Sequence, residues 1–368
     1  MSLNNRERVL EAVNFREADR APIDFWAAAE VFDRLAGELG VSGAEGVLKK
    51  FDADLRYYRG PGMTPATLGQ DGLFADHWGV KRKLQTVSGR RRDGRPYTWM
   101  YKHLAASPLA GARSVADIER YAWPDAARWD YSGVKAACGA IRSGGLAVVF
   151  GGDRLDRTAQ LKAGMYLRGT EQFVTDLCLE PELAECILQH VAGYYMDYNR
   201  RVFEAADGNI DIFFMGDDMG TQNSTWVSVE MYRKFFKKRF AGFNELAHNF
   251  GIKTMYHSCG RVTGLVGEFV DAGLDILQSL QPAPMKNDFA KIKREFGRRL
   301  CLQGGIDIQD VLPHGSPADV RRHVRETAEI LAPGGGYIFG TAHNIIPDVP
   351  TENILALVDA YKEFGRYG

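Results

Sequence analysis

The stretch Leu146–Gly152, LAVVFGG, is a run of apolar residues that ends in two glycines. A strand that is apolar at every position is typical of a parallel sheet covered by helices on both faces. The stretch Ile210–Asp218, IDIFFMGDD, has the same character and ends in a glycine followed by two acids. These two stretches favour an α/β fold built on a parallel sheet.

Predicted strands and helices alternate outward from these stretches in both directions. Strands are expected at Ile23–Trp26, Asp52–Tyr58, Leu146–Phe150, Ile210–Met215, Ile252–Met255, Ile276–Gln278, Leu300–Gln303 and Tyr337–Gly340. Eight such units, mostly followed by helices, favour a closed (β/α)8 TIM barrel. An open doubly wound sheet would normally carry a glycine fingerprint at its first turn, and none follows Phe25 or Tyr58. We therefore expect residues 1–368 to form a single barrel domain.

Residues 60–108 interrupt this alternation. The segment contains several glycines, the basic run Arg90–Arg92, and a predicted β-hairpin over Trp78–Met100 that turns near Gly89–Arg95. We expect an excursion, inserted after the second strand, that covers the barrel mouth. The arginines would form a solvated turn or, alternatively, an anion site.

Composition excludes several classes of function. The chain has 368 residues, a formal net charge of −1, 45% hydrophobic and 25% charged residues, which is ordinary for a soluble globular protein. A nearly neutral chain lacks the basic footprint of a nucleic-acid-binding protein. No apolar run approaches the roughly 20 residues that span a bilayer. The five cysteines are scattered and suggest no disulfide framework, so a cytoplasmic location is expected.

Polar side chains follow most of the predicted strands. Reacting groups of a TIM barrel lie at the carboxyl ends of its strands. Asp217 and Asp218 are adjacent, so their repulsion would raise the pKa of one and suit it to act as an acid or a metal ligand. Each strand-end acid could instead cap the next helix, which is the favoured explanation for Asp307. The strand-end candidates are Asp24, Asp54, Asp153, Asp217, Asp218, His257, Cys259, Gln278, Gln281, Asp307 and His343.

His257 and Cys259 form the strongest candidate for a metal site. They are two residues apart at the tip of a predicted strand, where alternate side chains point to the same side. An imidazole and a thiolate suit a borderline-soft ion such as Zn²⁺. The alternative is a buried histidine beside an inert buried cysteine. A zinc site needs three or four ligands, and this stretch supplies two.

Four stretches in the second half of the chain carry a resemblance to a known family. They are Gly216–Gln222, Tyr256–Gly260, Gln303–Asp307, and Gly340–Asn344 with Asp348–Asn353. In order and spacing the chain resembles the uroporphyrinogen decarboxylase superfamily over about Arg6–Tyr367, most clearly from Gly145 onward. The resemblance implies a (β/α)8 barrel.

The resemblance implies one of two chemistries. The decarboxylases of the superfamily remove acetate carboxyls from a porphyrinogen without a cofactor, and an arginine-rich segment after the first strand binds the substrate. The corresponding segment here, Phe25–Phe32, has no arginine. The methyltransferases of the superfamily hold zinc with a His-x-Cys pair and a later cysteine near the last strand. His257 and Cys259 match the pair, but Gly334–Gly336 contains no cysteine, so His343, Asp217, Asp218 or another acid would complete the site.

The sequence therefore predicts a zinc-dependent methyltransferase that moves a methyl group between a small substrate and a corrinoid carried by a partner protein. His257 and Cys259 would bind the metal. The catalytic candidates are Asp217, Asp218 and His343, and the substrate-binding candidates are Asp54, Gln222, Gln278 and Asp307. One alternative is a cofactor-independent uroporphyrinogen decarboxylase, with Asp54 or Asp217 facing the pyrrole nitrogens. Another is a non-catalytic binder of corrinoids or tetrapyrroles. No nucleic-acid or membrane partner is expected, and the helical exterior allows a homodimer.

Overall fold

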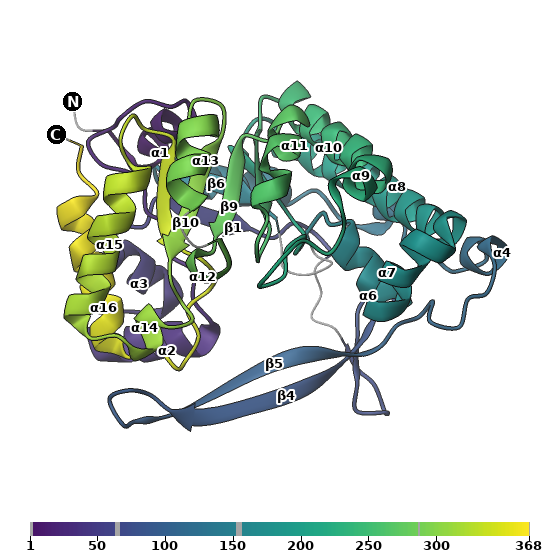
Figure 1. Ribbon diagram of the computed structural model, residues 1–368, viewed down its shortest axis with the longest axis horizontal. Helices are drawn as coiled ribbons and strands as arrows, with labels where there is room; N and C mark the ends of the chain where they lie inside the picture. The colour runs from purple at the N-terminus through teal and green to yellow at the C-terminus, as the bar shows by residue number, and fades with distance from the viewer. Residues whose placement is uncertain (1–2, 63–66, 152–156, 286–287, 368) are drawn as a thin grey trace.

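The computed structural model describes residues 3–62, 67–151, 157–285 and 288–367. Within these ranges the chain forms a curled seven-stranded sheet whose neighbouring strands are all parallel (Figure 1). The strand order in space follows the chain: β1 (Leu55–Tyr58), β6 (Ala147–Phe150), β7 (Ile212–Gly216), β8 (Lys253–His257), β9 (Ile276–Leu280), β10 (Cys301–Ile306) and β11 (Tyr337–Thr341). The predicted α/β fold with a parallel sheet is confirmed.

Helices surround the sheet because its strands are apolar on both faces. The larger helices are α2 (Ala29–Leu39), α3 (Gly43–Phe51), α5 (Val134–Ser143), α7 (Thr170–Leu179), α8 (Pro181–Ala206), α10 (Lys238–Asn249), α13 (Asp288–Phe296), α15 (Pro317–Leu331) and α16 (Thr351–Phe364). Shorter ones are α4 (Val115–Glu119), α6 (Leu161–Arg168), α9 (Val229–Tyr232), α11 (Val266–Asp271), α12 (Pro282–Met285) and α14 (Val311–His314). None of the described helices combines the length and the apolar character that a membrane crossing requires.

The inner face of the sheet has its own apolar cluster, separate from the one under the outer helices. Alternate strand residues such as Val149, Phe214 and Met255 belong to it. Helix α1 (Asn5–Val13) adds Val9 and Val13 to the same cluster. Its amino end is fixed by a capping box in which Asn4 and Glu7 exchange hydrogen bonds. Helix α1 therefore closes the amino end of the curled sheet, and the carboxyl ends are left for chemistry.

The first predicted strand, Ile23–Trp26, is not a regular strand. The segment makes isolated parallel bridges, Ile23 with Phe339 and Ala27 with Ile345. Asp24 N–H donates to Phe339 O at 2.8 Å, and Ile23 O accepts from Asp54 N–H at 2.8 Å. The segment thus lies between β11 and the start of β1, where an eighth strand would lie. It contacts both edges, but with too few consecutive ladder bonds to be a strand.

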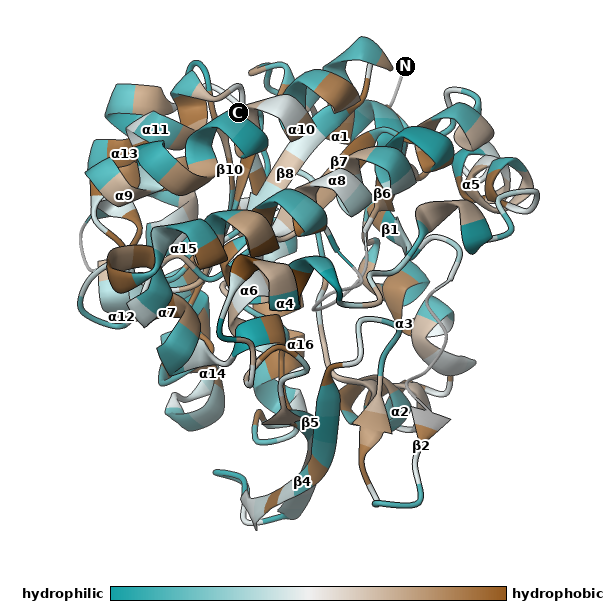
Figure 2. Ribbon diagram, turned by 90° about the vertical axis from the view of Figure 1, so that its right-hand side faces the viewer, coloured by the Kyte–Doolittle hydropathy of each residue, from teal (hydrophilic) through white to brown (hydrophobic). Residues whose placement is uncertain are grey.

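A second sheet lies within the segment 60–108. Its described strands are antiparallel: β2 (Thr67–Leu68), β3 (Phe74–Ala75), β4 (Lys81–Arg90) and β5 (Pro96–Ala106). The β4–β5 hairpin forms a long arm at the lower edge of the molecule (Figures 1 and 2). Arg92 at its turn lies 3.2 Å from Glu352 at the amino end of α16, and Met100 N–H donates to Glu30 of α2. The arm therefore touches elements that surround the carboxyl ends of the strands.

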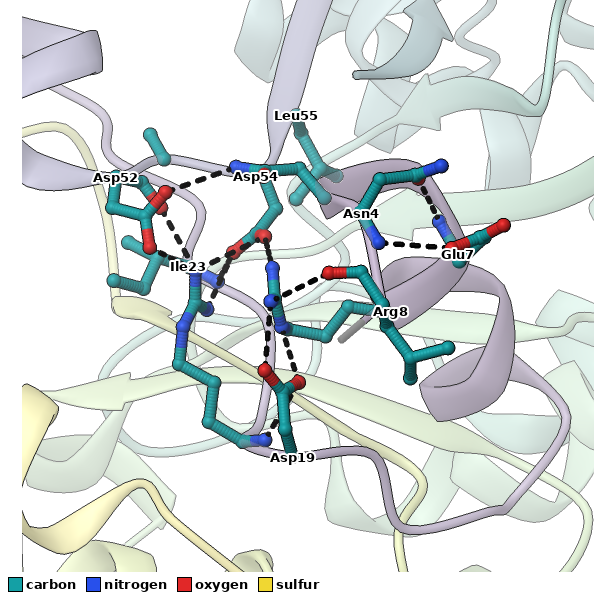
Figure 3. Close-up of polar contacts among 12 residues, drawn as sticks. Asn4, Glu7, Arg8, Asp19, Ile23, Asp52, Asp54 and Leu55 are labelled. Carbon is teal, nitrogen blue, oxygen red and sulfur yellow. Dashed lines mark hydrogen bonds and ion pairs between the residues drawn. The ribbon is translucent and has the colours of Figure 1, made fainter. Parts of the chain in front are cut away.

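Asp54 lies at the opposite end of the curled sheet from the one the sequence suggests. It precedes β1, is fully buried, and accepts hydrogen bonds from Arg8 at 2.6 Å and Arg20 at 2.7 Å (Figure 3). The backbone N–H of Ile23 donates to it at 2.6 Å. The expectation that Asp54 binds substrate or faces a pyrrole is therefore wrong, because its carboxylate joins α1, the bridging segment and β1 at the amino end.

We expect Asp54→Ala to lower the free energy of unfolding by about 3–5 kcal/mol, because two buried guanidinium groups lose their carboxylate. Denaturant unfolding of the purified variant measures this. Asp197→Ala, which removes an exposed ion pair with Arg201, is the matched control and should cost less than about 1 kcal/mol. Equal losses in the two variants would contradict a special role for Asp54.

Asp24 is a second buried acid, and it faces the inside of the curled sheet. Its Oδ2 accepts from Tyr57 O–H at 2.5 Å and from the Gln303 side chain. Burial raises the pKa of Asp24 to about 6, although hydrogen bonds from Tyr57 and Gln303 favour the ionised form. The folded protein therefore holds this proton to a higher pH than the unfolded chain does.

This pKa gives a stability prediction with a definite sign. The free energy of unfolding falls as the pH rises from about 4 to about 6. Over this range Asp24 is ionised in the unfolded chain but still protonated in the folded protein. Asp24→Asn cannot ionise, so its free energy of unfolding relative to wild type should rise over this window by on the order of 2–3 kcal/mol. Urea unfolding of both proteins at several pH values measures the difference. Parallel profiles would show that Asp24 does not titrate in this range.

Candidate metal centre

His257 and Cys259 lie side by side at the carboxyl end of β8. The Nε2 atom of His257 is 3.0 Å from the Sγ atom of Cys259. On the other side of the ring, Nδ1 lies against the amide oxygen of Gln278, which is directly opposite on β9. Because Nδ1 donates to this oxygen, Nε2 is the nitrogen turned toward the thiol. Gln278 thus orients the imidazole.

His343 joins this pair from the loop after β11. The ligand atoms of His257, Cys259 and His343 all lie within 4.8 Å of one another, and the two imidazole rings are 5.5 Å apart. Strands β9 and β10 separate β8 from β11 in the sheet. The curl of the sheet therefore brings the three side chains to a common position. Cys259 and His343 are half-buried, so the cluster is open on one side.

Cys259 and His257 carry opposite charges even without a metal. Burial opposes ionisation of Cys259, but the charge and hydrogen bond of His257, with a hydrogen bond from His343, lower its pKa to about 6. Burial likewise opposes protonation of His257. The Cys259 thiolate and Asp218 outweigh this effect and raise the pKa of His257 to about 9. The thiol is therefore a thiolate near neutral pH, the form that binds metal ions.

Asp218 adds an acceptor beside the three ligands. Its Oδ1 atom is buried, lies 3.5 Å from His257 Nε2, and has no hydrogen-bond donor among the described residues. Its Oδ2 atom pairs with Lys162. Burial opposes its ionisation, but the nearby His257 ring and the charge of Lys162 hold the pKa of Asp218 well below its usual range. Lys162 was missed in the sequence, because a lysine in the first turn of a helix carries no functional signal.

Asp217 has a structural task despite its position next to Asp218. Its carboxylate accepts from the backbone N–H of Gln160 at 2.9 Å and of Lys162 at 2.7 Å. These are orphan donors at the amino end of α6, so Asp217 caps this helix. The hydroxyl of Tyr256 lies 3.4 Å away. With its oxygens engaged in this way, Asp217 is not placed to act on a ligand.

Ser279 fixes the loop that carries His343. It follows Gln278 in β9, has a left-handed φ of +70°, and its hydroxyl donates to Ala342 O. A positive φ is costly for a residue other than glycine and is kept where surrounding structure requires it. Ser279 thereby links the end of β9 to the residue before His343. Nothing in the sequence marks it, since a serine within an apolar strand is unremarkable.

Two glycines allow the loops around the centre to pack backbone against backbone. A Cβ atom on Gly260 would lie 2.4 Å from the carbonyl carbon of Gly220, and one on Gly220 would lie 2.6 Å from the backbone of Arg261. Gly220 N–H donates to Cys259 O at 3.1 Å. The loop after β7 therefore supports the loop that presents Cys259.

The other candidates lie outside the cluster. Gln222 is exposed in the loop after β7. Asp307 accepts from the backbone N–H groups of Gln309 at 2.7 Å and Asp310 at 2.8 Å, so it caps the turn before α14. Gln281 accepts from Gly260 N–H. Asp153 lies outside the described residues.

The donor set fits a zinc ion. One sulfur and two imidazole nitrogens are common ligands of zinc, and three protein ligands leave the open position of a catalytic site. The contact of Gln278 with Nδ1 of His257 is the outer-shell bond that zinc-binding histidines typically make. The buried Asp218 Oδ1, without a donor among the described residues, is an oxygen that a cation or substrate hydrogen could satisfy.

Comparison with known proteins identifies the family. The family model described as uroporphyrinogen decarboxylase (URO-D) matches residues 110–364. The chain belongs to this family. A methylated-thiol–coenzyme M methyltransferase of Methanosarcina mazei is 27% identical over 206 residues, 56% of this chain and 52% of the relative. A uroporphyrinogen decarboxylase of Chlorobium phaeobacteroides is 25% identical over 197 residues, half of each chain. The chain thus spans about half the length of these curated relatives.

A solved structure supports the fold. A methyltransferase from Methanosarcina mazei superimposes with a TM-score of 0.68 at 19% identity, covering 98% of this chain and 99% of that chain. At this level of identity the likeness shows a shared α/β fold.

We expect Gln278→Leu to weaken zinc binding by about 10- to 100-fold, because His257 loses the acceptor that orients its ring. Titration against a chromophoric chelator measures the affinity. Gln85→Leu changes an exposed glutamine on the β4–β5 arm and serves as the control. Unchanged affinity in a folded Gln278→Leu protein would contradict the positioning role.

Proposed function

We propose that this protein is a zinc-dependent methyltransferase that moves a methyl group between a small substrate and a corrinoid carried by a partner protein. The observation that carries the proposal is the convergence of His257, Cys259 and His343. The proposal takes further support from the family, whose relatives include a methyltransferase that acts on methylated thiols. The curled sheet and the bridging segment at Ile23–Ala27 are interpreted in this proposal as a (β/α)8 barrel.

In this proposal each group of the centre has a separate task. His257, Cys259 and His343 hold the metal, and Gln278 keeps the first of them in place. Zinc in such a site supplies a Lewis acid that activates the substrate atom carrying or receiving the methyl group. Asp218, ionised and held by Lys162, offers its Oδ1 atom as an acceptor for a substrate hydrogen. The half-open side of the cluster admits the substrate.

The third ligand bears on the kind of substrate. The resemblance leads us to expect a second cysteine near the last strand, and His343 takes that place here. Two imidazoles and one thiolate make a harder, less electron-rich set than two thiolates and one imidazole. Such a set suits polarisation of an ether or methylamine-type substrate. We therefore propose a demethylase-like reaction, with the corrinoid protein as methyl acceptor.

Two observations weigh against uroporphyrinogen decarboxylation. A tetrapyrrole with several carboxylates needs cations to bind them, and Phe25–Phe32 contains no arginine. Asp54, a candidate to face the pyrrole nitrogens, is instead buried between Arg8 and Arg20 at the amino end. Phe25–Phe32 therefore supplies no cation for the carboxylates of a uroporphyrinogen, and Asp54 supplies no carboxylate for its pyrrole nitrogens.

Metal analysis and a methyl-transfer assay test the proposal together. Relative to wild type, Cys259→Ala and His343→Ala should each lose one equivalent of zinc and more than about 100-fold of the rate of corrinoid methylation or demethylation, since a direct ligand matters at least as much as an outer-shell group. The corrinoid absorbance spectrum follows the reaction. Cys178→Ala, an exposed cysteine on α7, should keep both properties.

Two results would overturn the proposal. One is zinc content that is equal in wild type and in both ligand variants. The other is turnover of uroporphyrinogen by metal-free wild-type protein, which would restore the decarboxylase alternative.

A further inference from the structure

A second cluster of ligand-type side chains lies away from the strand ends. Glu119 at the end of α4 meets Cys186 and His190 of α8, and their ligand atoms all lie within 4.8 Å of one another. The two carboxylate oxygens of Glu119 contact different partners, Cys186 Sγ at 3.3 Å and His190 Nε2 at 3.1 Å. Figure 1 places α4 at the edge of the molecule, far from the curled sheet. The centre described above uses none of these residues.

Helix geometry fixes two of the three ligands relative to each other. Cys186 and His190 are four residues apart on α8, so they lie one turn apart on the same face. The indole of Trp123 stacks on the His190 ring at 4.5 Å and 7°. Trp123 Nε1–H donates to Ile118 O at 3.0 Å, which ties this ring to α4. The imidazole is therefore held with Nε2 toward Glu119.

The distances suit a single tetrahedral ion. Zinc bonds of about 2.0–2.3 Å place neighbouring ligand atoms about 3.3–3.8 Å apart. The contacts of 3.1 and 3.3 Å run to different oxygens of Glu119, so a turn of the carboxylate and a small outward shift would place one oxygen, the sulfur and the nitrogen around one ion. Cys186 is 7% exposed and Glu119 is exposed, so one side of the cluster reaches solvent for a fourth, water ligand.

We propose that Glu119, Cys186 and His190 form a second zinc site, which fastens α4 to α8. Sulfur, imidazole nitrogen and carboxylate oxygen are all zinc ligands, and the mixture suits zinc better than calcium or magnesium, which prefer oxygen alone. On binding, the Cys186 thiol releases its proton to solvent and the thiolate becomes the ligand. Glu119, Cys186 and His190 then each bond to the zinc ion in place of their present contacts with one another. The site is structural, because it joins two helices remote from the strand ends.

Zinc counting on the full chain tests this proposal. Wild-type protein, loaded with zinc and desalted, should bind one equivalent more than Cys186→Ala. His190→Asn should lose the same equivalent, and Cys178→Ala, on the neighbouring helix α7, should lose none. Cobalt substitution gives an independent readout, since a thiolate–cobalt charge-transfer band from this site should vanish in Cys186→Ala. Added zinc should also raise the Tm of Cys259→Ala but not that of Cys259→Ala/Cys186→Ala.

The outcomes separate this site from the proposed catalytic centre. If the catalytic centre binds no zinc but this site does, Cys259→Ala keeps the wild-type zinc content and Cys186→Ala loses it. Equal zinc content in wild type, Cys186→Ala and His190→Asn, with an unchanged cobalt spectrum, would overturn the second site. The cluster would then be a hydrogen-bonded contact between α4 and α8.

Discussion

The two-sided hydrogen bonding of the segment at Ile23–Ala27 is the constraint on which the candidate centre depends. The segment bonds to Phe339 in β11 and to Asp54 before β1, so the two edges of the parallel sheet approach each other. His257 on β8 and His343 after β11 are separated by two strands in the sheet. They meet because a curled parallel sheet directs all its carboxyl ends toward one axis.

The acids near the strands differ in function because their surroundings differ. Asp54 lies between two guanidinium groups at the amino end, Asp217 caps a helix, and Asp307 caps a turn. Among the strand-end acids discussed, Asp218 has one oxygen held by a lysine while the other faces the cluster. A carboxylate becomes available to a ligand only when backbone donors have not already engaged it. Sequence position alone does not distinguish these cases.

Much of the architecture could be predicted because it depends on local pattern. The apolar runs at Leu146–Phe150 and Ile210–Met215 predict buried parallel strands, and the structure has them at Ala147–Phe150 and Ile212–Gly216. The prediction of a regular strand at Ile23–Trp26 was wrong, because the pairing of this segment depends on two partners that are distant in the sequence. The strand predicted over Asp52–Tyr58 begins three residues later, at Leu55, so Asp54 precedes it and lies at its amino end. Lys162 and Ser279 gave no signal, since their roles arise from tertiary position.

Lys162 joins the two adjacent acids through different parts of one residue. Its backbone N–H binds Asp217, and its ammonium group binds Asp218. The first turn of α6 therefore sets both the anchoring of the loop after β7 and the charge that His257 experiences. A displacement of α6 along its axis would strain the cap and move the ammonium group at the same time. The helix and the ligand pair are thus mechanically coupled, and a molecule that presses on α6 would change the electrostatic environment of Cys259 without touching it.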